Sequence, residues 1–396
     1  MQWTVHLDGG PRRVNHAAIM IGDKIYSFGG YCSGEDYETR RPMDVHILDT
    51  ATYRWRAVPL PSRTSPQYYV APYQRYGHTV VNYRGRAYIW GGRNDGDGAC
   101  DILYEFDPCT NSWTSIQTSG ITPPARDGHS ACLMGASEDQ MVVFGGFEEE
   151  FQRFSNETYL FDFRNLKWTE LRTMGVPPQW RDFHTATAIG SKMYVFGGRS
   201  DHLGQFHSNK EIYYDHLKYL DLSDSTWYTP TVNRSGDNKP SGRRSHSAWE
   251  YKGCLYVFGG FNGNDNRHFN DLLKYDPAES KWYRLKPLGL GPKPRRRQCC
   301  VVNGSKLFLF GGTSPLVDSP VLNLNDPLWP ERNLVDHSDL YVLDMAPSLK
   351  TLAMTKVVND GRLHTQLDSL PADLKWELMA VTHPNKISAP RADSSG

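Results

Sequence analysis

The sequence predicts an all-β fold made of six repeated units, and three observations lead to that prediction. The 396 residues include 35 Gly and 25 Pro, and 12% of them are aromatic, a balance that favours short strands joined by turns. Glycine pairs recur six times at intervals of 52 to 62 residues, each directly after an aromatic residue. Five times an Asp is followed six residues later by a Trp. A period of this length indicates similar structural units placed side by side.

The charge balance and the distribution of apolar residues exclude several classes of protein. There are 44 Lys and Arg against 44 Asp and Glu, so no net field draws the molecule to nucleic acid or to an anionic membrane. No apolar run approaches the roughly 20 residues of a membrane span. The seven cysteines form no C-x-x-C pair, which favours reduced thiols. We therefore expect a cytoplasmic and nuclear protein that binds neither nucleic acid nor membrane.

Each glycine pair ends a short apolar run, which we interpret as a buried strand. Residues 25–28 and 193–196 are two such runs. A double glycine after a strand indicates backbone that needs positive φ or has no room for a side chain. The pairs are Gly29-Gly30, Gly91-Gly92, Gly145-Gly146, Gly197-Gly198, Gly259-Gly260 and Gly311-Gly312.

Two further marks repeat around these strands. Upstream lies R-x-x-H, at residues 75–78, 126–129, 181–184 and 243–246, whereas the first unit keeps only Val14-Asn15-His16 and the sixth ends in Gln298. Downstream of the glycine pair, five units have an Asp that is followed six residues later by a Trp. The tryptophans are Trp55, Trp113, Trp168, Trp227 and Trp282.

These marks together resemble the kelch repeat, so the chain is similar to kelch β-propellers. The resemblance implies six blades, each a four-stranded sheet, with large aromatic side chains filling the wedge between neighbours. The sixth unit has Lys350 where the repeat has Trp, but Trp3-Thr4-Val5 resembles Trp168-Thr169-Glu170. We infer that the amino-terminal strand completes the last blade and removes an exposed sheet edge. We thus expect a six-bladed kelch propeller over residues 1–345, closed by that strand.

The residues after the repeats fit two amphipathic helices. Leu349, Leu352, Ala353 and Val357 fall at helical spacing on one face, and Pro371 stands near the start of the second stretch, where its missing N–H costs nothing. Periodicity alone fits a helical cap that packs on the propeller.

The spacing also resembles a ligase-binding motif. The first stretch resembles the elongin C box, with Leu349 and Val357 in register and Ala353 where that box usually has Cys. The second resembles the cullin-2 box, with Leu370, Pro371 and Leu374 in register. The resemblance implies that residues 346–382 bind elongin C with elongin B, and cullin-2 with its RING subunit. Residues 383–396 follow as a flexible tail.

A kelch ring followed by these boxes resembles the non-catalytic substrate receptors of cullin-2 ubiquitin ligases that bind carboxy-terminal degrons. That resemblance implies a pocket for proteins ending in glycine at the mouth of the propeller, formed by residues after the glycine pairs and inside R-x-x-H. The expected degron-binding residues are Phe147, Arg199, Arg244, Ser245, Arg93 and Asp182.

Within that set the resemblance implies separate tasks. Arg199, with Arg244 and Ser245, would hold the terminal carboxylate, since guanidinium binds carboxylate through two parallel hydrogen bonds. Phe147 would wall a slot that excludes any side chain on the last residue. The related receptors have a second arginine five residues after the first, where this chain has Gly204, so Arg244 or Arg93 would replace it.

Other interpretations remain open. The chain ends in Gly396, and we hypothesise that it occupies its own pocket or that of another copy. A kelch scaffold or chromatin-associated module without a ligase would use the same face. A kelch enzyme would need a catalytic cluster, yet the sequence has no Ser-His-Asp, phosphate-loop or Rossmann motif. We expect no metal, because His202, His207 and His216 lack zinc-site spacing, and no cofactor.

Overall fold

The computed structural model describes residues 1–35, 39–135, 137–208, 210–231, 239–316, 333–360 and 370–387. Over these ranges the chain consists mainly of short strands, and its helices are α1 (Pro66–Val70), α3 (Leu349–Asn359) and α4 (Ala372–Thr382). None of the helices in the described ranges has the length and apolar character needed to cross a bilayer. The all-β class expected from the sequence is confirmed.

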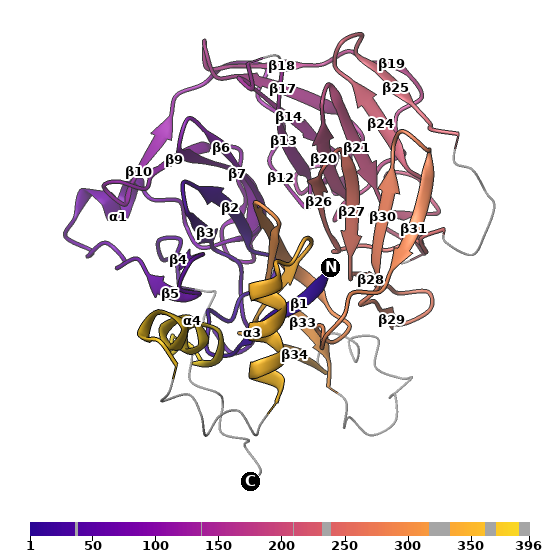
Figure 1. Cartoon of the computed structure of the whole chain (residues 1–396). Helices are drawn as coiled ribbons and strands as arrows, with labels where there is room; N and C mark the ends of the chain where they lie inside the picture. Colours follow the sequence, from indigo (N-terminus) through magenta and orange to yellow (C-terminus); the bar gives the residue numbers. More distant parts are fainter. Residues whose placement is uncertain are drawn as a thin grey trace.

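In the described part of the chain, six sheets with a path of four antiparallel strands surround a common centre (Figure 1). Five of them run from the centre outward in chain order. They are β2 (Ala17–Ile21), β3 (Lys24–Phe28), β4 (Val45–Asp49), β5 (Arg54–Ala57); β6 (Tyr76–Tyr83), β7 (Arg86–Asn94), β9 (Leu103–Asp107), β10 (Ser112–Ile116); β13 (Ser130–Met134), β14 (Gln140–Phe144), β17 (Thr158–Asp162), β18 (Lys167–Glu170); β20 (Thr185–Ile189), β21 (Lys192–Phe196), β24 (Lys218–Asp221), β25 (Thr226–Tyr228); and β26 (Ser247–Tyr251), β27 (Cys254–Phe258), β30 (Leu272–Asp276), β31 (Lys281–Leu285).

The sixth sheet combines the two ends of the repeat region. From the centre outward it contains β32 (Arg296–Asn303), β33 (Lys306–Pro315), β35 (Leu340–Asp344) and β1 (Gln2–Leu7). β1 pairs antiparallel with β35, with Trp3 opposite Leu343. The prediction that the amino-terminal strand completes the last sheet is therefore confirmed, and the innermost strands β32 and β2 lie in contact.

Short strands extend these sheets or lie in the loops at their ends. β8 (Gly98–Ala99) and β34 (Leu334–Asp336) pair with β7 and β33, while β11 (Ser119–Gly120) and β19 (Met174–Gly175) pair in parallel with β18 and β25. Three small ribbons follow glycine pairs. They are β12 (Arg126–Asp127) with β15 (Phe147–Glu148) and β16 (Arg153–Phe154), β22 (Arg199–Asp201) with β23 (Glu211–Tyr213), and β28 (Phe261–Asn262) with β29 (Arg267–His268).

Tryptophan fills every wedge between neighbouring sheets. The tryptophan of each outermost strand packs on the aromatic residue that precedes the glycine pair in the preceding sheet, at ring-centroid distances of 5.0–6.1 Å. The pairs are Trp113 with Phe28, Trp168 with Trp90, Trp227 with Phe144, Trp282 with Phe196, Trp3 with Phe258 and Trp55 with Phe310. Trp3 thus takes the place left empty by Lys350 and makes the aromatic contacts continuous around the ring.

The glycine pairs let the next unit approach closely. Gly259 has φ +70°, and a Cβ there would lie 2.9 Å from the carbonyl oxygen of Arg295. The amide of Gly260 donates to that same carbonyl, with N···O 2.8 Å. Only glycine combines the left-handed φ with the space for this contact.

The first arginine of each R-x-x-H stretch is buried and braces its own sheet. Each donates through Nη1 to the carbonyl of the first glycine of its own unit, at 2.7–3.3 Å. The arginines are Arg75, Arg126, Arg181, Arg243 and Arg295. The prediction that the first unit lacks this arginine was wrong. Arg13 is buried there, forms an ion pair with Asp44, and accepts at its carbonyl from the amide of Gly312.

A closed cycle of six backbone hydrogen bonds joins the units at the centre, and we call it the hydrogen-bonded ring. The third residue of each R-x-x-H stretch has a left-handed φ of 49–70°, and its N–H donates to the equivalent carbonyl of the preceding unit at 2.7–3.1 Å. The residues are Asn15, Gly77, Gly128, Phe183, Ser245 and Arg297. The amide of Asn15 donates to Arg297, which completes the cycle.

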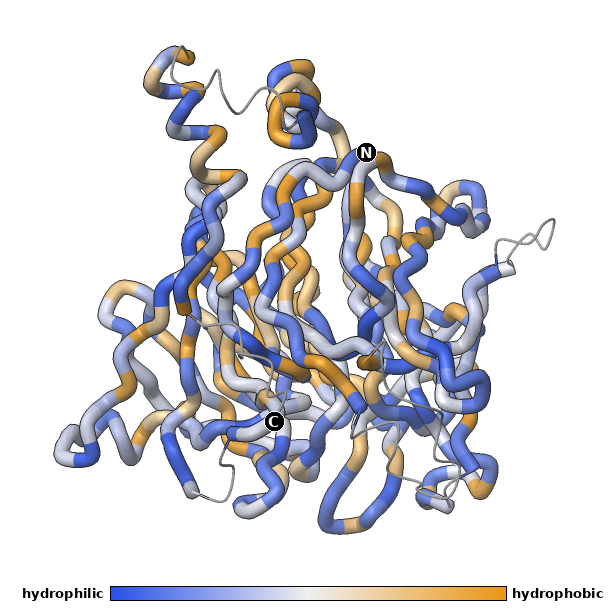
Figure 2. The backbone as a smooth tube through the Cα atoms, turned by 90° about the horizontal axis from the view of Figure 1, so that it is seen from below, coloured by the Kyte–Doolittle hydropathy of each residue, from blue (hydrophilic) through white to orange (hydrophobic). Residues whose placement is uncertain are grey.

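The two carboxy-terminal helices pack beside β1 (Figure 1). Ser348 caps α3 by accepting from the amide of Thr351 at 3.1 Å, and Pro371 precedes α4, as expected from the sequence. Figure 2 shows apolar residues gathered along the strands and mostly polar residues in the connecting loops. The core thus lies within and between the sheets, and the loops lie at their ends.

Candidate functional site

A cavity of about 550 Å³ opens at the end of the sheets where the glycine pairs lie. Three residues of the hydrogen-bonded ring, Asn15, Phe183 and Arg297, line both this cavity and the narrow central channel. Loops of several units supply its walls. The lining residues are Asn15, Tyr31, Tyr76, Arg93, Asp95, Asp127, Phe147, Gln152, Asp182, Phe183, Arg199, His207, Arg244 and Arg297.

Five of the six residues proposed from the sequence line this cavity. They are Phe147, Arg199, Arg244, Arg93 and Asp182. Ser245 lies deeper, in the wall of the central channel, and its buried hydroxyl has no hydrogen-bond partner among the described residues.

Arg199, the first residue of β22, is held by two carboxylates. Its Nε and Nη2 donate to the two oxygens of Asp182 at 3.1 and 2.5 Å, and Nη1 donates to Glu211 at 3.0 Å. The backbone supports this geometry, because the amides of Asp182 and Arg199 donate to one another's carbonyls. Burial alone lowers the pKa of Arg199, but the charges and hydrogen bonds of Asp182 and Glu211 raise it above its usual value. Arg199 is therefore a fixed, fully charged group in the wall.

Asp127 is a second buried carboxyl group in the same cavity. The residue is only 5% exposed and lines the cavity together with Asp182. Burial first, and then the negative charge of Asp182, raises the pKa of Asp127 to about 7, although the positive charges of Arg93 and Arg199 oppose that change. Asp127 thus changes its charge near neutral pH.

Three further guanidinium groups surround the cavity. Arg93 lies 3.5 Å from carboxylate oxygens of both Asp95 and Glu149. Arg297 donates to the Tyr31 hydroxyl at 2.7 Å, and Arg244 lies over the Phe261 ring at 5.5 Å. The guanidinium groups around this cavity can bind a carboxylate by donating charge-assisted hydrogen bonds to its oxygens.

The acidic stretch at residues 148–150 divides between the interior and the cavity mouth. Glu148 is completely buried and pairs with Arg126 at 3.0 Å and Arg153 at 2.8 Å. Glu149 approaches Arg93. Glu148 therefore braces the third unit and is not available to a ligand.

No metal-binding group emerges from the described ranges. Within them no cluster of three or more His, Cys, Asp or Glu has metal-binding geometry. Burial and the charge of Arg243 lower the pKa of His246 to about 3, which keeps that inter-sheet ring neutral. Four R-x-x-H histidines, His78, His129, His184 and His246, bond to the preceding sheet instead, as His78 Nε2 does with the Phe28 carbonyl oxygen at 3.1 Å.

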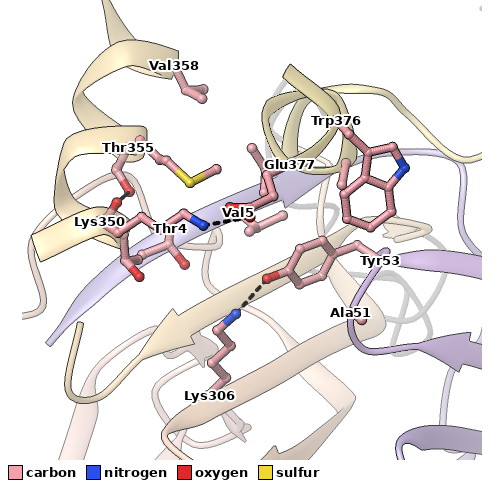
Figure 3. A pocket seen from close by; sticks show the side chains of 14 residues that line it. Thr4, Val5, Ala51, Tyr53, Lys306, Lys350, Thr355, Val358, Trp376 and Glu377 are labelled. Carbon is pink, nitrogen blue, oxygen red and sulfur yellow. Dashed lines mark hydrogen bonds and ion pairs between the residues drawn. The ribbon is translucent and has the colours of Figure 1, made fainter. Parts of the chain in front are cut away.

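The tail helices lie at the opposite end of the sheets from the cavity. Tyr53, in the turn after β4, and Lys306, at the start of β33, border a hollow of about 280 Å³ beneath α3 and α4 (Figure 3). Lys306 Nζ donates to the Tyr53 hydroxyl at 2.8 Å, and Lys350 pairs with Glu377 at 2.6 Å, joining the two helices.

The predicted ligase-binding residues differ in exposure. Leu349 is 86% exposed, and Leu352 and Ala353 are also exposed, whereas Val357 is half-buried. Pro371 is exposed, and Leu370 and Leu374 are half-buried. The apolar face expected for α3 therefore points mainly to solvent, and Met354 and Thr355 face the sheets instead.

Nine of the fourteen lining residues were not among the six site residues proposed from the sequence. Among them, Asp127 and Arg297 occupy interior positions of R-x-x-H stretches, equivalent to Asp182 and Ser245. Both belong to the positions inside R-x-x-H that the sequence assigned to the pocket as a class, although neither was chosen among the six site residues.

Family models match most of the repeat region. The KLHDC2/KLHL20/DRC7 Kelch-repeats domain matches residues 77–312, and the Kelch motif matches residues 12–62. Kelch domain-containing protein 3 of Bos taurus is 49% identical over 402 residues, covering 100% of both chains, and that of Homo sapiens is 49% identical over 401 residues with the same coverage. Host cell factor 2 of Homo sapiens is 30% identical over 66% of this chain and 32% of its own length. The solved structure of YjhT superimposes with a TM-score of 0.57 at 16% identity, over 77% of this chain and 92% of that one, which concerns the fold alone.

Proposed function

Because the chain belongs to the kelch-repeat family, within the group of kelch domain-containing protein 3, we propose that it is the substrate receptor of a cullin-2 RING ubiquitin ligase. Kelch repeats are generally non-catalytic binding domains. In this proposal residues 1–345 form one six-bladed propeller, residues 346–382 form the ligase-binding tail, and the protein acts in cytoplasm and nucleus. The observation that carries the proposal is the solvent-exposed apolar face of α3.

That face has the character of a protein-binding surface. Leu349 and Leu352 are large apolar side chains left in water, next to Ala353, on a helix whose other side is packed. Exposed apolar patches of this kind mark sites of protein interaction. We assign this face to elongin C, with elongin B, and assign Leu370, Pro371 and Leu374 at the start of α4 to cullin-2. Val357 would complete the elongin contact.

The cavity at the other end would receive the cargo, a protein ending in glycine. Arg244 and Arg93 would bind the terminal carboxylate, while Arg199 adds a positive charge whose position Asp182 fixes. Phe147 would narrow the slot, so that only a residue without Cβ enters. Ser245 would lie at the bottom, facing the channel. Gly396, the hypothetical internal competitor, lies outside the described residues.

Coexpression tests the receptor role. Elongins B and C with cullin-2 should copurify with the wild-type chain and not with a Leu349→Ala plus Pro371→Ala variant. Leu290→Ala is the matched control, because Leu290 is 81% exposed but lies on a loop of the ring. Failure of the wild type to copurify with these partners would overturn the ligase assignment and favour a kelch scaffold.

Peptide binding tests the cargo assignment separately. A peptide ending in glycine should bind to the wild type. The same peptide with an amidated end, or with alanine as its last residue, should bind at least about tenfold more weakly, because the carboxylate contact or the fit is lost. Equal affinity for all three peptides would contradict the proposed pocket.

A further inference from the structure

The five residues after α4 cross the seam at which the ring closes. At this seam β1 and β5, the outermost strands of the sixth and first sheets, contribute Val5, Leu7 and Trp55 to one apolar cluster. Asn385 is only 8% exposed there, unlike its exposed neighbour Lys386. A buried asparagine needs partners for both its donor and its acceptor.

Asn385 finds those partners on both sides of the seam. Its backbone amide donates to the carbonyl of Asp8, directly after β1, at 2.7 Å. Its side chain accepts from the amide of Trp55 at 2.9 Å and donates to the carbonyl of Tyr53 at 3.1 Å. One residue thus bonds to the sixth sheet through its backbone and to the first sheet through its side chain.

The surrounding contacts are equally specific. Gly9 has φ +81°, and a Cβ there would lie 2.0 Å from the carbonyl oxygen of Asn385. The amide of Ile387 donates to the carbonyl of Gly9 at 2.9 Å. Only glycine at position 9 permits this approach.

The same segment fixes the end of α4. Arg54 donates to the carbonyls of His383, Met379 and Ala380 at 2.7–3.3 Å, where a cation also interacts favourably with the helix dipole. Ala380 and Ile387 pack in the same apolar cluster as Trp55. The carboxy-terminal turn of α4 and the seam therefore share one set of contacts.

We propose that Asn385 is a positioning residue that joins the closure seam to α4, so that the tail holds its fixed orientation only while β1 is in place. The coupling between β1 and α4 is inferred only from the contacts of Asn385, Gly9 and Arg54 described above. Its consequence, that the ligase is presented at a fixed orientation to cargo, rests on the proposed function.

Hydrogen exchange of the full chain tests the coupling. In Asn385→Ala, amides of β1 and α4 should both exchange at least about tenfold faster, because two buried side-chain hydrogen bonds are lost, while amides of β14 should not change. Lys386→Ala is the matched control and should match the wild type. Unchanged exchange in β1 or α4, or an equal increase in every sheet, would overturn the proposal.

Two variants separate the role of the side chain from general destabilisation. Asn385→Asp keeps the acceptor for the Trp55 amide but loses the donor to Tyr53, so its effect should be intermediate. Gly9→Ala should reproduce the pattern of Asn385→Ala, because its methyl group displaces the Asn385 carbonyl. If Gly9→Ala accelerated exchange in β1 without affecting α4, the two would not be coupled.

Ubiquitin transfer tests the functional consequence. In the reconstituted ligase, Asn385→Ala should retain the affinity for a glycine-ended peptide yet modify a substrate carrying that peptide several-fold more slowly than Lys386→Ala does. Equal rates would contradict the positioning role. If the wild type assembled no ligase, the proposed function would fail while the exchange result would still decide the coupling.

Discussion

Arg199 shows how strongly individual residues of the cavity depend on one another. Its guanidinium is the only partner that the described residues offer to the carboxylate oxygens of Asp182, which is 1% exposed at its side chain. Asp127 adds a second buried carboxyl group close by. The cavity therefore keeps its charges in place through the Arg199–Asp182 pair.

Removing that guanidinium should destabilise the protein. Arg199→Ala leaves the buried Asp182 carboxylate unpaired, and we expect the free energy of unfolding to fall by about 3–5 kcal/mol. Urea denaturation measures the difference. Arg199→Ala combined with Asp182→Asn should recover part of the loss, because the unpaired charge is gone. A curve for Arg199→Ala that overlies the wild type would show that the ion pair does not stabilise the fold.

Asp127 should make stability depend on pH. Burial and the charge of Asp182 raise its pKa from the model-peptide value of 3.8 to about 7, so the folded chain holds this proton over a range in which the unfolded chain has lost it. The stability associated with the proton is therefore lost as the pH rises from about 4 to about 7. Asp127→Asn should raise the melting temperature more at about pH 8 than at about pH 5. Equal shifts at both pH values would contradict the raised pKa.

At the residue scale, repeat position predicted which side chains would gather, but not their pairing. Phe147, Arg93 and Arg244 line the cavity as expected. The partner of Arg199 did not follow from the sequence, because Asp182 lies seventeen residues away on another loop and was assigned to the ligand. Which carboxylate meets which arginine depends on how the loops fold over one another.

At the element scale, β1 is the strand on which the ring most depends. Trp3 is 7% exposed and packs on Phe258 and Tyr341 at 6.1 and 5.9 Å. Trp3→Ala should lower the free energy of unfolding by about 3–5 kcal/mol through the lost packing and the cavity left behind. Thermal melting measures this, with Trp376→Ala as a control because Trp376 is 54% exposed. Equal melting temperatures for Trp3→Ala and the wild type would refute the closure role.

The strands were predictable because their residues repeat, and the exceptions have physical reasons. Gln298 replaces the histidine of the sixth unit and still reaches the preceding sheet, since its Nε2 donates to the Phe258 carbonyl at 3.2 Å. Arg13 was overlooked, although it completes R-x-x-H with His16. For α3 the periodicity located an apolar face but not its direction, because helical spacing alone does not distinguish a buried face from an exposed one.

At the scale of the whole molecule, cavity and tail lie at opposite ends of the same sheets. The sequence predicted closure, since Trp3 supplied the missing tryptophan. It did not predict the hydrogen bonds of Asn385 at the closure seam. The partners Trp55 and Tyr53 lie more than three hundred residues away in the chain. No repeat pattern covers that contact, because it occurs once.

The hydrogen-bonded ring restricts how this chain can change its length during evolution. Every unit supplies one N–H and one carbonyl to the cycle, within a reach of 2.7–3.1 Å. A chain that lost or duplicated one unit would have to form a ring of different circumference while keeping the same N···O distance between neighbouring units. Insertions within a unit meet no such barrier, and the intervals between glycine pairs already range from 52 to 62 residues. Growth is thus confined to the loops, while geometry holds the number of units constant.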